Sequence, residues 1–191
     1  MYWILSTESI VETDAWIKGQ PEVIKKYDIH LGLGIRQRVD IPTIEIIMKK
    51  EHQGRLTDNL IAHGATGLVV NQKIKKILDD LEIDNIHYYP TTVINQVTNE
   101  IINDYQTGNI IGRIKCVNFD QSDLELDEDD GSIEFISKLV LKEKVLKNTD
   151  LKIFRMAEFF PIILAHDSVK NAMTNQQISG IRFYHPEEYV L

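Results

Sequence analysis

The sequence has only one cysteine, Cys116, in 191 residues. An internal disulfide needs two cysteines and a cysteine-based zinc cluster needs more, so neither can form. Cys116 lies in the stretch 110–117, where strand alternation would put it on one face with Ile110 and Ile114. We therefore expect a buried small side chain in a strand, with a reactive thiol as the alternative.

Long hydrophobic runs are also missing. A membrane-spanning helix needs about 20 nearly continuous apolar residues, and the longest runs here, such as 159–165, are far shorter. The apolar start at 1–5 is followed at once by Ser, Thr and Glu, which is not the pattern of a signal peptide. With 43% hydrophobic and 26% charged residues, the composition is that of an ordinary folded domain. We expect a cytoplasmic protein in a single domain, residues 1–191, that does not bind membranes.

The familiar sequence signatures of catalysis are absent too. The chain has no Gly-x-Ser-x-Gly elbow, no His-Glu-x-x-His pair and no phosphate-binding loop that ends in Gly-Lys-Ser/Thr. The stretch 32–34 begins like a dinucleotide-binding loop, but Gln37 occupies the third glycine position. A calcium loop centred on Gly131 fails, because Leu126 and Ser137 fall where an oxygen ligand and a bidentate glutamate are needed. These absences predict a protein that is not an enzyme and uses no cofactor or metal.

Some side chains leave other interpretations open. The six histidines are scattered, and no two have the spacing of metal ligands on a helix. A small enzyme with an unrecognised site near His87, His185 and Tyr184 is one alternative, and a stand-alone interaction domain is another. Arg155, in an apolar strand, is interpreted as part of a structural ion pair or as a binding arginine.

Positive charge is missing from one part of the chain, between Phe119 and Glu134. The net charge is −8, and removing the eight acids of this segment from the total of 29 leaves 21, which equals the number of bases. Nucleic-acid binding needs a basic face and is therefore disfavoured, whereas a basic protein partner fits. The candidate partner-binding residues are these eight acids: Asp120, Asp123, Glu125, Asp127, Glu128, Asp129, Asp130 and Glu134.

Alternating apolar residues and turn signals predict a sheet-rich chain. The expected strands are 43–49, 86–89 (ended by Pro90), 99–105, 110–119, 133–141 and 151–156. The segment 106–109 is predicted to be a hairpin turn. The apolar face of 133–141 would hold Ile133, Phe135, Leu139 and Leu141, with a helix as the alternative.

Two main helices are expected as well. Asp167 is predicted to cap one of them, which carries Val169, Ala172 and Met173 on its apolar face. A short helix at 9–17 and a sharp turn at 30–34 are further expectations. Asn71 is predicted to cap the other main helix, whose apolar face holds Ile74, Ile77, Leu78 and Leu81.

The two helices also suggest an internal repeat. A shift of 95 residues aligns 69–89 with 164–184, and apolar positions coincide along both segments. The alternative is a chance agreement between two unrelated units of the same kind. The predicted fold class is α+β: a mostly antiparallel sheet with two main helices and, by this alignment, a helix-turn-strand repeat.

The order of short motifs in the C-terminal two thirds resembles a known family. The motifs are GLVV at 67–70, YP at 89–90, VNFDQS at 117–122, LVL at 139–141, FR at 154–155, IIL at 162–164 and SGIRF at 179–183, followed by Pro186. This order is similar to that of the bacterial immunity-protein family numbered eleven among polymorphic toxin systems. The resemblance covers roughly residues 55–191, and the N-terminal part, 1–54, adds nothing distinctive.

The resemblance implies a cytoplasmic protein that binds and neutralises a cognate bacterial toxin, with no catalytic residues. Its recurring positions, such as Phe154, Arg155, Gly180 and Phe183, have the character of structural residues rather than of a toxin-binding face. The acidic segment is then the candidate surface for the toxin, and such a partner would be basic.

Overall fold

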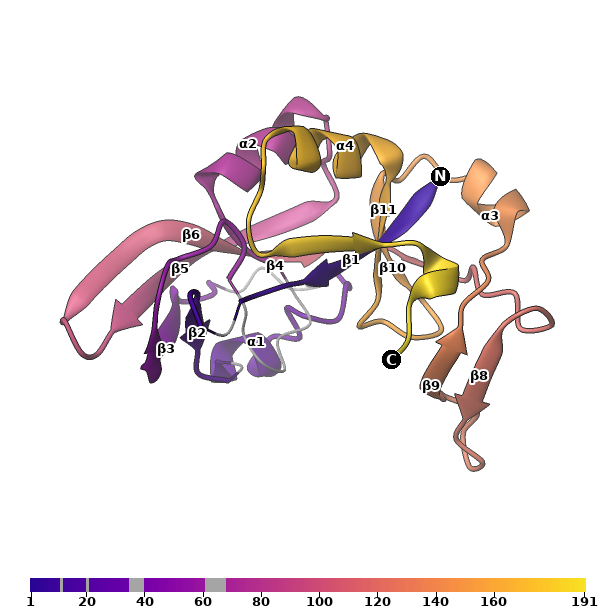
Figure 1. Ribbon diagram of the computed structural model, residues 1–191, viewed down its shortest axis with the longest axis horizontal. Helices are drawn as coiled ribbons and strands as arrows, with labels where there is room; N and C mark the ends of the chain where they lie inside the picture. The colour runs from indigo at the N-terminus through magenta and orange to yellow at the C-terminus, as the bar shows by residue number, and fades with distance from the viewer. Residues whose placement is uncertain (11, 20, 35–39, 61–67) are drawn as a thin grey trace.

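The computed structural model describes residues 1–10, 12–19, 21–34, 40–60 and 68–191. Two five-stranded sheets form its centre, and a separate two-stranded hairpin extends from one end (Figure 1). The first sheet has the order β12 (Ile181–Tyr184), β1 (Tyr2–Thr7), β11 (Ile163–His166), β10 (Ile153–Met156) and β7 (Arg113–Ile114). The second has the order β2 (Ala15–Ile17), β3 (Ile44–Gln53), β5 (Ile86–Asn95), β6 (Glu100–Ile110) and β4 (Leu68–Asn71). The hairpin pairs β8 (Asp123–Leu126) with β9 (Ile133–Lys138).

The helices in the described part of the chain are few and short. They are α1 (Glu22–Lys26), α2 (Gln72–Asp80), α3 (Glu143–Lys147), α4 (Asp167–Asn175) and the 3-10 helix η1 (Pro186–Glu188). Only β7 with β10 and β3 with β5 pair in parallel among the named strands, and their other ladders are antiparallel. The α+β class with a mostly antiparallel arrangement and two main helices, α2 and α4, is therefore as expected.

Capping side chains start the two main helices. The Asn71 side chain accepts hydrogen bonds from the backbone N–H groups of Lys73 and Ile74, as predicted for α2. The prediction that Asp167 caps α4 is wrong, because the cap is the preceding residue, His166, whose ring accepts from the Ser168 N–H. Asp167 instead accepts a hydrogen bond of 2.6 Å from the indole N–H of Trp3.

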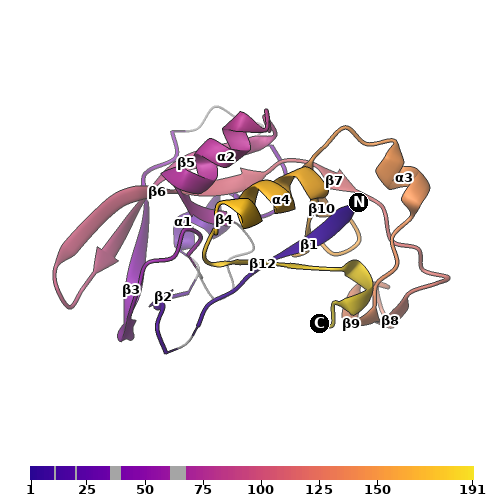
Figure 2. The ribbon, with the colours of Figure 1, turned by 45° about the horizontal axis from the view of Figure 1, so that its top comes forward.

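The two main helices lie side by side over one shared core (Figures 1 and 2). Their buried residues join one apolar cluster with residues of both sheets, among them Leu5, Leu68, Ile110 and Ile163. Burying such side chains is the main force that holds strands and helices together. The helix residues in this cluster are Ile74, Ile77, Leu78, Val169 and Met173.

The elements around α2 and α4 have corresponding boundaries. β4, α2 and the start of β5 begin at residues 68, 72 and 86, and β11, α4 and β12 begin at 163, 167 and 181. In each unit an antiparallel strand lies between the two strands that flank the helix: β6 lies between β4 and β5, and β1 lies between β11 and β12. The two units therefore share both element order and strand placement.

The predicted hairpin turn at 106–109 is wrong. β6 runs without a break through these residues, and the actual turn lies between β5 and β6, where the Asn95 side chain accepts from the N–H groups of Val97 and Thr98. Gly108 sits inside the strand because a side chain there would crowd Ile86, whose Cγ2 lies 3.1 Å from the place of a Cβ.

β5 also continues past Pro90, where the sequence suggested an end. β3 pairs with β5 only from Thr91 onward, so at Pro90 one edge of β5 has no paired residue of β3. A residue without an N–H can be accommodated at such a position.

Two further expectations are wrong. Residues 15–17 form strand β2 rather than the end of a helix at 9–17. β9 is a strand, but a register shift between β8 and β9 turns Phe135 outward, so that it is 37% exposed, while Ile133 and Ile136 are buried. Gln37, Gly67 and His63 lie outside the described residues.

Arg155 is completely buried in β10, and its Nη1 donates a 2.9 Å hydrogen bond to the carbonyl oxygen of Phe160. Burial, with a smaller effect from Arg113, lowers the pKa of Arg155 to about 10. A binding arginine would need access to the surface, so this side chain has a structural role.

Cys116 is completely buried, as expected, but it lies just beyond the two-residue strand β7 rather than in a strand. The Glu158 carboxylate accepts hydrogen bonds from the N–H groups of Cys116 and Val117, in place of a neighbouring strand. Burial, reinforced by the negative charge of Glu158, raises the pKa of the thiol to about 12.

We predict that a thiol reagent modifies Cys116 at least about 100-fold more slowly in the native protein than in urea, because only the exposed thiolate reacts readily. The rate of thiol labelling at pH 8, with and without denaturant, measures this. Equal rates in the two conditions would show that the thiol is accessible.

A network around Asp58 joins α2 to the loop before β12. Its carboxylate accepts hydrogen bonds from the Asn71 side chain and from both the N–H and the hydroxyl of Ser179. Burial alone would raise the pKa of Asp58, but these hydrogen bonds and the nearby Lys73 outweigh it and lower the pKa.

We predict that Asp58→Asn destabilises the protein by about 2 kcal/mol at pH 7, since an amide satisfies fewer of these donors. The pKa is lower in the folded state than the value of about 3.9 in the unfolded state, so the wild-type advantage is complete above that pH and is lost as the pH falls through the folded pKa. Urea unfolding of the wild type and of Asp58→Asn between pH 7 and pH 3 measures the gap between their free energies of unfolding. Asp84→Asn, at an exposed loop residue, is the control, and a gap that widens in acid would contradict the prediction.

Candidate partner-binding face

The acidic segment forms the β8–β9 hairpin and its approaches. Seven of its eight acids are exposed and Asp127 is half-buried. Figure 1 shows this hairpin projecting at the end of the molecule that also holds the C-terminus. Within the described residues, none of the eight carboxylates takes part in an ion pair. Their charge is therefore directed at solvent.

The acids at the hairpin tip shape the turn themselves. Asp127 Oδ1 accepts hydrogen bonds of 2.8 and 3.0 Å from the N–H groups of Asp129 and Asp130. Asp130 in turn accepts from Ser132 N–H, and the Ser132 hydrogen bonds lower the pKa of Asp130. Gly131 has φ of 69°, a left-handed conformation that suits glycine. Four consecutive acids can thus be held at a tight turn.

The other side of the hairpin attaches it to the core. Ile133 and Ile136 belong to an apolar cluster with Phe154 and Leu164 of the first sheet. The N–H of Leu191 donates a 3.0 Å hydrogen bond to the carbonyl of Ile136, so the C-terminal segment runs against β9. The hairpin therefore has an apolar inner side on the core and an outer side where the acids lie together with the exposed Leu126 and Phe135.

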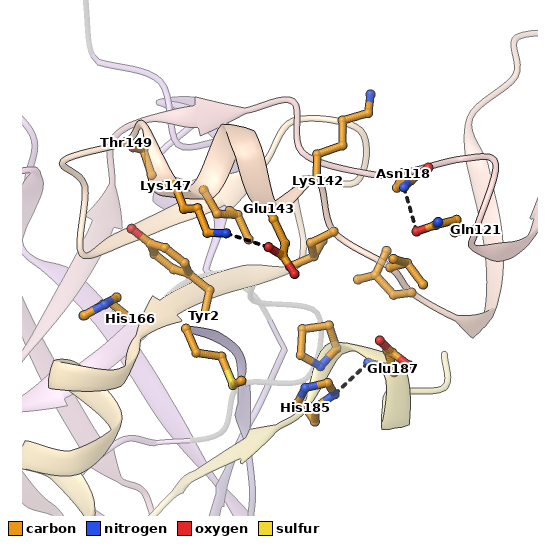
Figure 3. A pocket seen from close by; sticks show the side chains of 16 residues that line it. Tyr2, Asn118, Gln121, Lys142, Glu143, Lys147, Thr149, His166, His185 and Glu187 are labelled. Carbon is orange, nitrogen blue, oxygen red and sulfur yellow. Dashed lines mark hydrogen bonds and ion pairs between the residues drawn. The ribbon is translucent and has the colours of Figure 1, made fainter.

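A cavity of about 870 Å³ lies beside the hairpin (Figure 3). It is built by segments far apart in the sequence: the start of β1, the residues that follow β9, helix α3, and the region around η1. Such a volume is typical of a ligand-binding pocket. The lining residues are Met1, Tyr2, Asn118, Gln121, Leu139, Val140, Leu141, Lys142, Glu143, Leu146, Lys147, Thr149, His166, His185, Pro186 and Glu187.

Hydrogen bonds and a ring contact hold polar groups of the cavity in place. The Tyr2 hydroxyl donates a 2.7 Å hydrogen bond to the carbonyl of Leu151, and the His166 ring lies edge-on to the Tyr2 ring at 5.3 Å. Burial, followed by the charge of Asp150, raises the pKa of Tyr2. On the opposite side, the His185 ring accepts from the N–H of Glu187.

The structure does not assemble the alternative enzyme site suggested by the sequence. His87 is exposed on β5 of the second sheet, and neither it nor Tyr184 lines the cavity. His185 does line it, together with His166, which sequence reasoning did not connect with it. His166 ends β11 and His185 directly follows β12, the two strands that flank β1, and this similar position at a strand end is the signal that could have paired them. Among the described residues, no group of three or more His, Cys, Asp or Glu is arranged to hold a metal ion.

Comparison with known proteins identifies the class. The sequence matches the immunity protein family (Imm11) over residues 5–188, which is nearly the whole chain, and the protein belongs to that family. The match includes most of the N-terminal part, where the sequence alone showed no family feature. No curated protein matches the chain. In the described part of the chain, no helix is long and apolar enough to cross a membrane.

Proposed function

We propose that this protein is a bacterial immunity protein that binds and neutralises the cognate toxin of a polymorphic toxin system. The family match over residues 5–188 is the observation that carries the proposal. The protein acts in the cytoplasm by binding and not by catalysis, and it needs neither a cofactor nor a metal. Its partner is a protein rather than a nucleic acid or an anionic membrane surface, because both of these require a basic face and the net negative charge of the chain comes from one acidic segment.

The acidic hairpin is the proposed contact surface for a basic toxin. Ordering eight like charges within 16 residues is unfavourable in isolation and becomes easier against a cationic surface. A nuclease toxin has such a surface, since it must bind phosphate itself. An acidic hairpin that covers this surface would speed encounter and block access of the nucleic acid. A hairpin that serves only solubility is the alternative that the test must distinguish.

Two structural proposals accompany the function. The shared apolar cluster of the two sheets supports a single domain over 1–191. The 95-residue offset of the element boundaries supports a helix-turn-strand repeat, formed by 69–89 and 164–184. Superposition of the Cα atoms of the two segments tests the repeat, and a poor fit would reject it.

Co-expression with the products of neighbouring genes tests the proposed function. The expected result is rescue of growth from one toxic product, together with a complex that purifies on an affinity tag. A toxin from an unrelated locus is the control and should remain toxic. If every neighbouring product is harmless or stays toxic, and none binds the chain, the immunity function is rejected.

A further inference from the structure

The cavity and the acidic hairpin form one continuous surface. Residues 139–141, which line the cavity, follow β9 directly, and Asn118 and Gln121 lie at the start of the acidic segment. Lys138, at the end of β9, reaches Glu187 on the cavity wall at 3.9 Å. A protein that contacts the hairpin can therefore also reach the cavity wall.

The cavity wall carries two carboxylates, Glu143 and Glu187, and two lysines, Lys142 and Lys147. In Figure 3 the carboxylates of Glu143 on α3 and Glu187 on η1 face the cavity from opposite walls. The Lys142 side chain points away from it. Each carboxylate has an exposed lysine partner: Lys147 lies 2.7 Å from Glu143, one helical turn away, and Lys138 lies 3.9 Å from Glu187. Exposed pairs of this kind stabilise a protein little, so an incoming cation can replace either lysine.

The rest of the wall combines polar side chains, among them Asn118, Gln121 and Thr149, with apolar and aromatic surface. Leu139, Leu141, Leu146 and Pro186 supply aliphatic surface, and the Tyr2 ring stands at one side. An occupant that matches these walls has an aliphatic stem and a cationic end. The cavity thus combines apolar contact with two carboxylates on facing walls.

We propose that this cavity binds an arginine side chain presented by the basic protein partner, an inference that rests on the proposed function. The aliphatic part of the arginine packs on the leucines, and its guanidinium donates hydrogen bonds to Glu143 and Glu187 and lies against Tyr2. Arginine fits better than lysine, because its planar guanidinium has five donors, can bridge two carboxylates and stacks on aromatic rings. Arginine is also among the residues that contribute most to binding when they fill a pocket at the centre of an interface.

Capped tripeptides provide a test that does not need the toxin. Ac-Gly-Arg-Gly-amide is titrated into the ¹⁵N-labelled protein, with the citrulline peptide as an uncharged probe of the same shape. We expect saturable shifts of the Tyr2, Leu141 and His185 amide signals with the arginine peptide, and at least about fivefold weaker binding of the citrulline peptide. Shifts that do not saturate, that are confined to the hairpin, or that are equal for both peptides would overturn the proposal.

A charge-neutral variant identifies the carboxylates. Glu143→Gln with Glu187→Gln keeps the size of both side chains and should weaken binding of the arginine peptide at least about fivefold. The matched control, Glu22→Gln with Glu82→Gln, removes two exposed acids outside the cavity and should leave the affinity unchanged. An unchanged affinity in the cavity variant would overturn the assignment.

The same variant separates this inference from the proposed function. If the toxin recovered by co-expression binds the cavity variant as tightly as the wild type, the cavity is not its anchor, although the immunity function stands. If no neighbouring product binds the chain but the arginine peptide still saturates the cavity and distinguishes the variants, the immunity function fails, while the preference of the cavity for arginine holds.

Discussion

Gly180→Ala should destabilise the protein by about 3–5 kcal/mol. Gly180 has φ of +82°, and a Cβ at this position would lie 2.0 Å from the carbonyl oxygen of Asn59 and 2.9 Å from the Thr57 hydroxyl oxygen. The backbone of Asn59 cannot easily retreat, because its N–H donates to Ser179 and its side chain donates to the Gly180 carbonyl. The free energy of unfolding in urea, measured by circular dichroism, gives the loss.

Gly131→Ala is the matched control for this prediction. Gly131 also has a left-handed conformation, with φ of +69°, but nothing lies within 4 Å of the position of a Cβ. Gly131→Ala should therefore destabilise the protein only by the conformational cost of a left-handed residue, about 1–2 kcal/mol. Equal losses in the two variants would mean that the contact with Asn59 relaxes freely and that backbone conformation alone matters.

Local signals were sufficient for the two main helices. Asn71 at a helix start, followed by apolar residues at helical spacing, leaves little choice of structure over 72–80. For α4 the same spacing located the helix, but Asp167 and His166 are adjacent and both can cap. Asp167 instead binds the indole N–H of Trp3 and the N-terminal ammonium of Met1, which lie at the other end of the chain, while His166 caps the helix. A cap set by such a distant partner cannot be found in a local pattern.

The β5–β6 region shows where local reasoning fails. The sequence at 106–109 has the residues of a turn, Thr-Gly-Asn among them, yet Thr107 and Asn109 are buried strand residues. Asn109 makes hydrogen bonds to the loop at Gly32 and Leu33, more than 70 residues away in sequence. Polar residues usually mark a turn because they need solvent or partners, and here the fold supplies the partners.

The two parts of the candidate face differ in the same way. The acidic segment could be expected at the surface from sequence, because burying eight carboxylates without cations is far too costly. The cavity could not be expected, since its walls come from the two ends of the chain and from the region around α3. Glu143 and Glu187 gain a shared role only when the fold places them on opposite walls.

Neutralising the hairpin tip should slow association with a basic toxin by about tenfold or more at low salt. The variant changes Asp127, Asp129 and Asp130 to Asn and Glu128 to Gln. Asparagine keeps the side-chain oxygens that accept from Asp129, Asp130 and Ser132 N–H groups, so the turn and the fold should persist. The variant loses the negative electrostatic potential that attracts a cationic partner to this end of the molecule. Stopped-flow or surface-plasmon-resonance association rates, with the toxin recovered by co-expression, measure it.

Salt and a matched variant show whether the effect is steering. The wild-type rate should fall steeply as ionic strength rises, and the two proteins should converge at high salt because the charges are then screened. The control changes the net charge by the same amount away from the hairpin. It neutralises four exposed acids at the end of α2 and in the loop after it: Asp79, Asp80, Glu82 and Asp84. If the control slows association as much as the hairpin variant, only net charge matters. If the hairpin variant keeps the wild-type rate, affinity and protection in cells, the acidic segment is not the surface that meets the toxin.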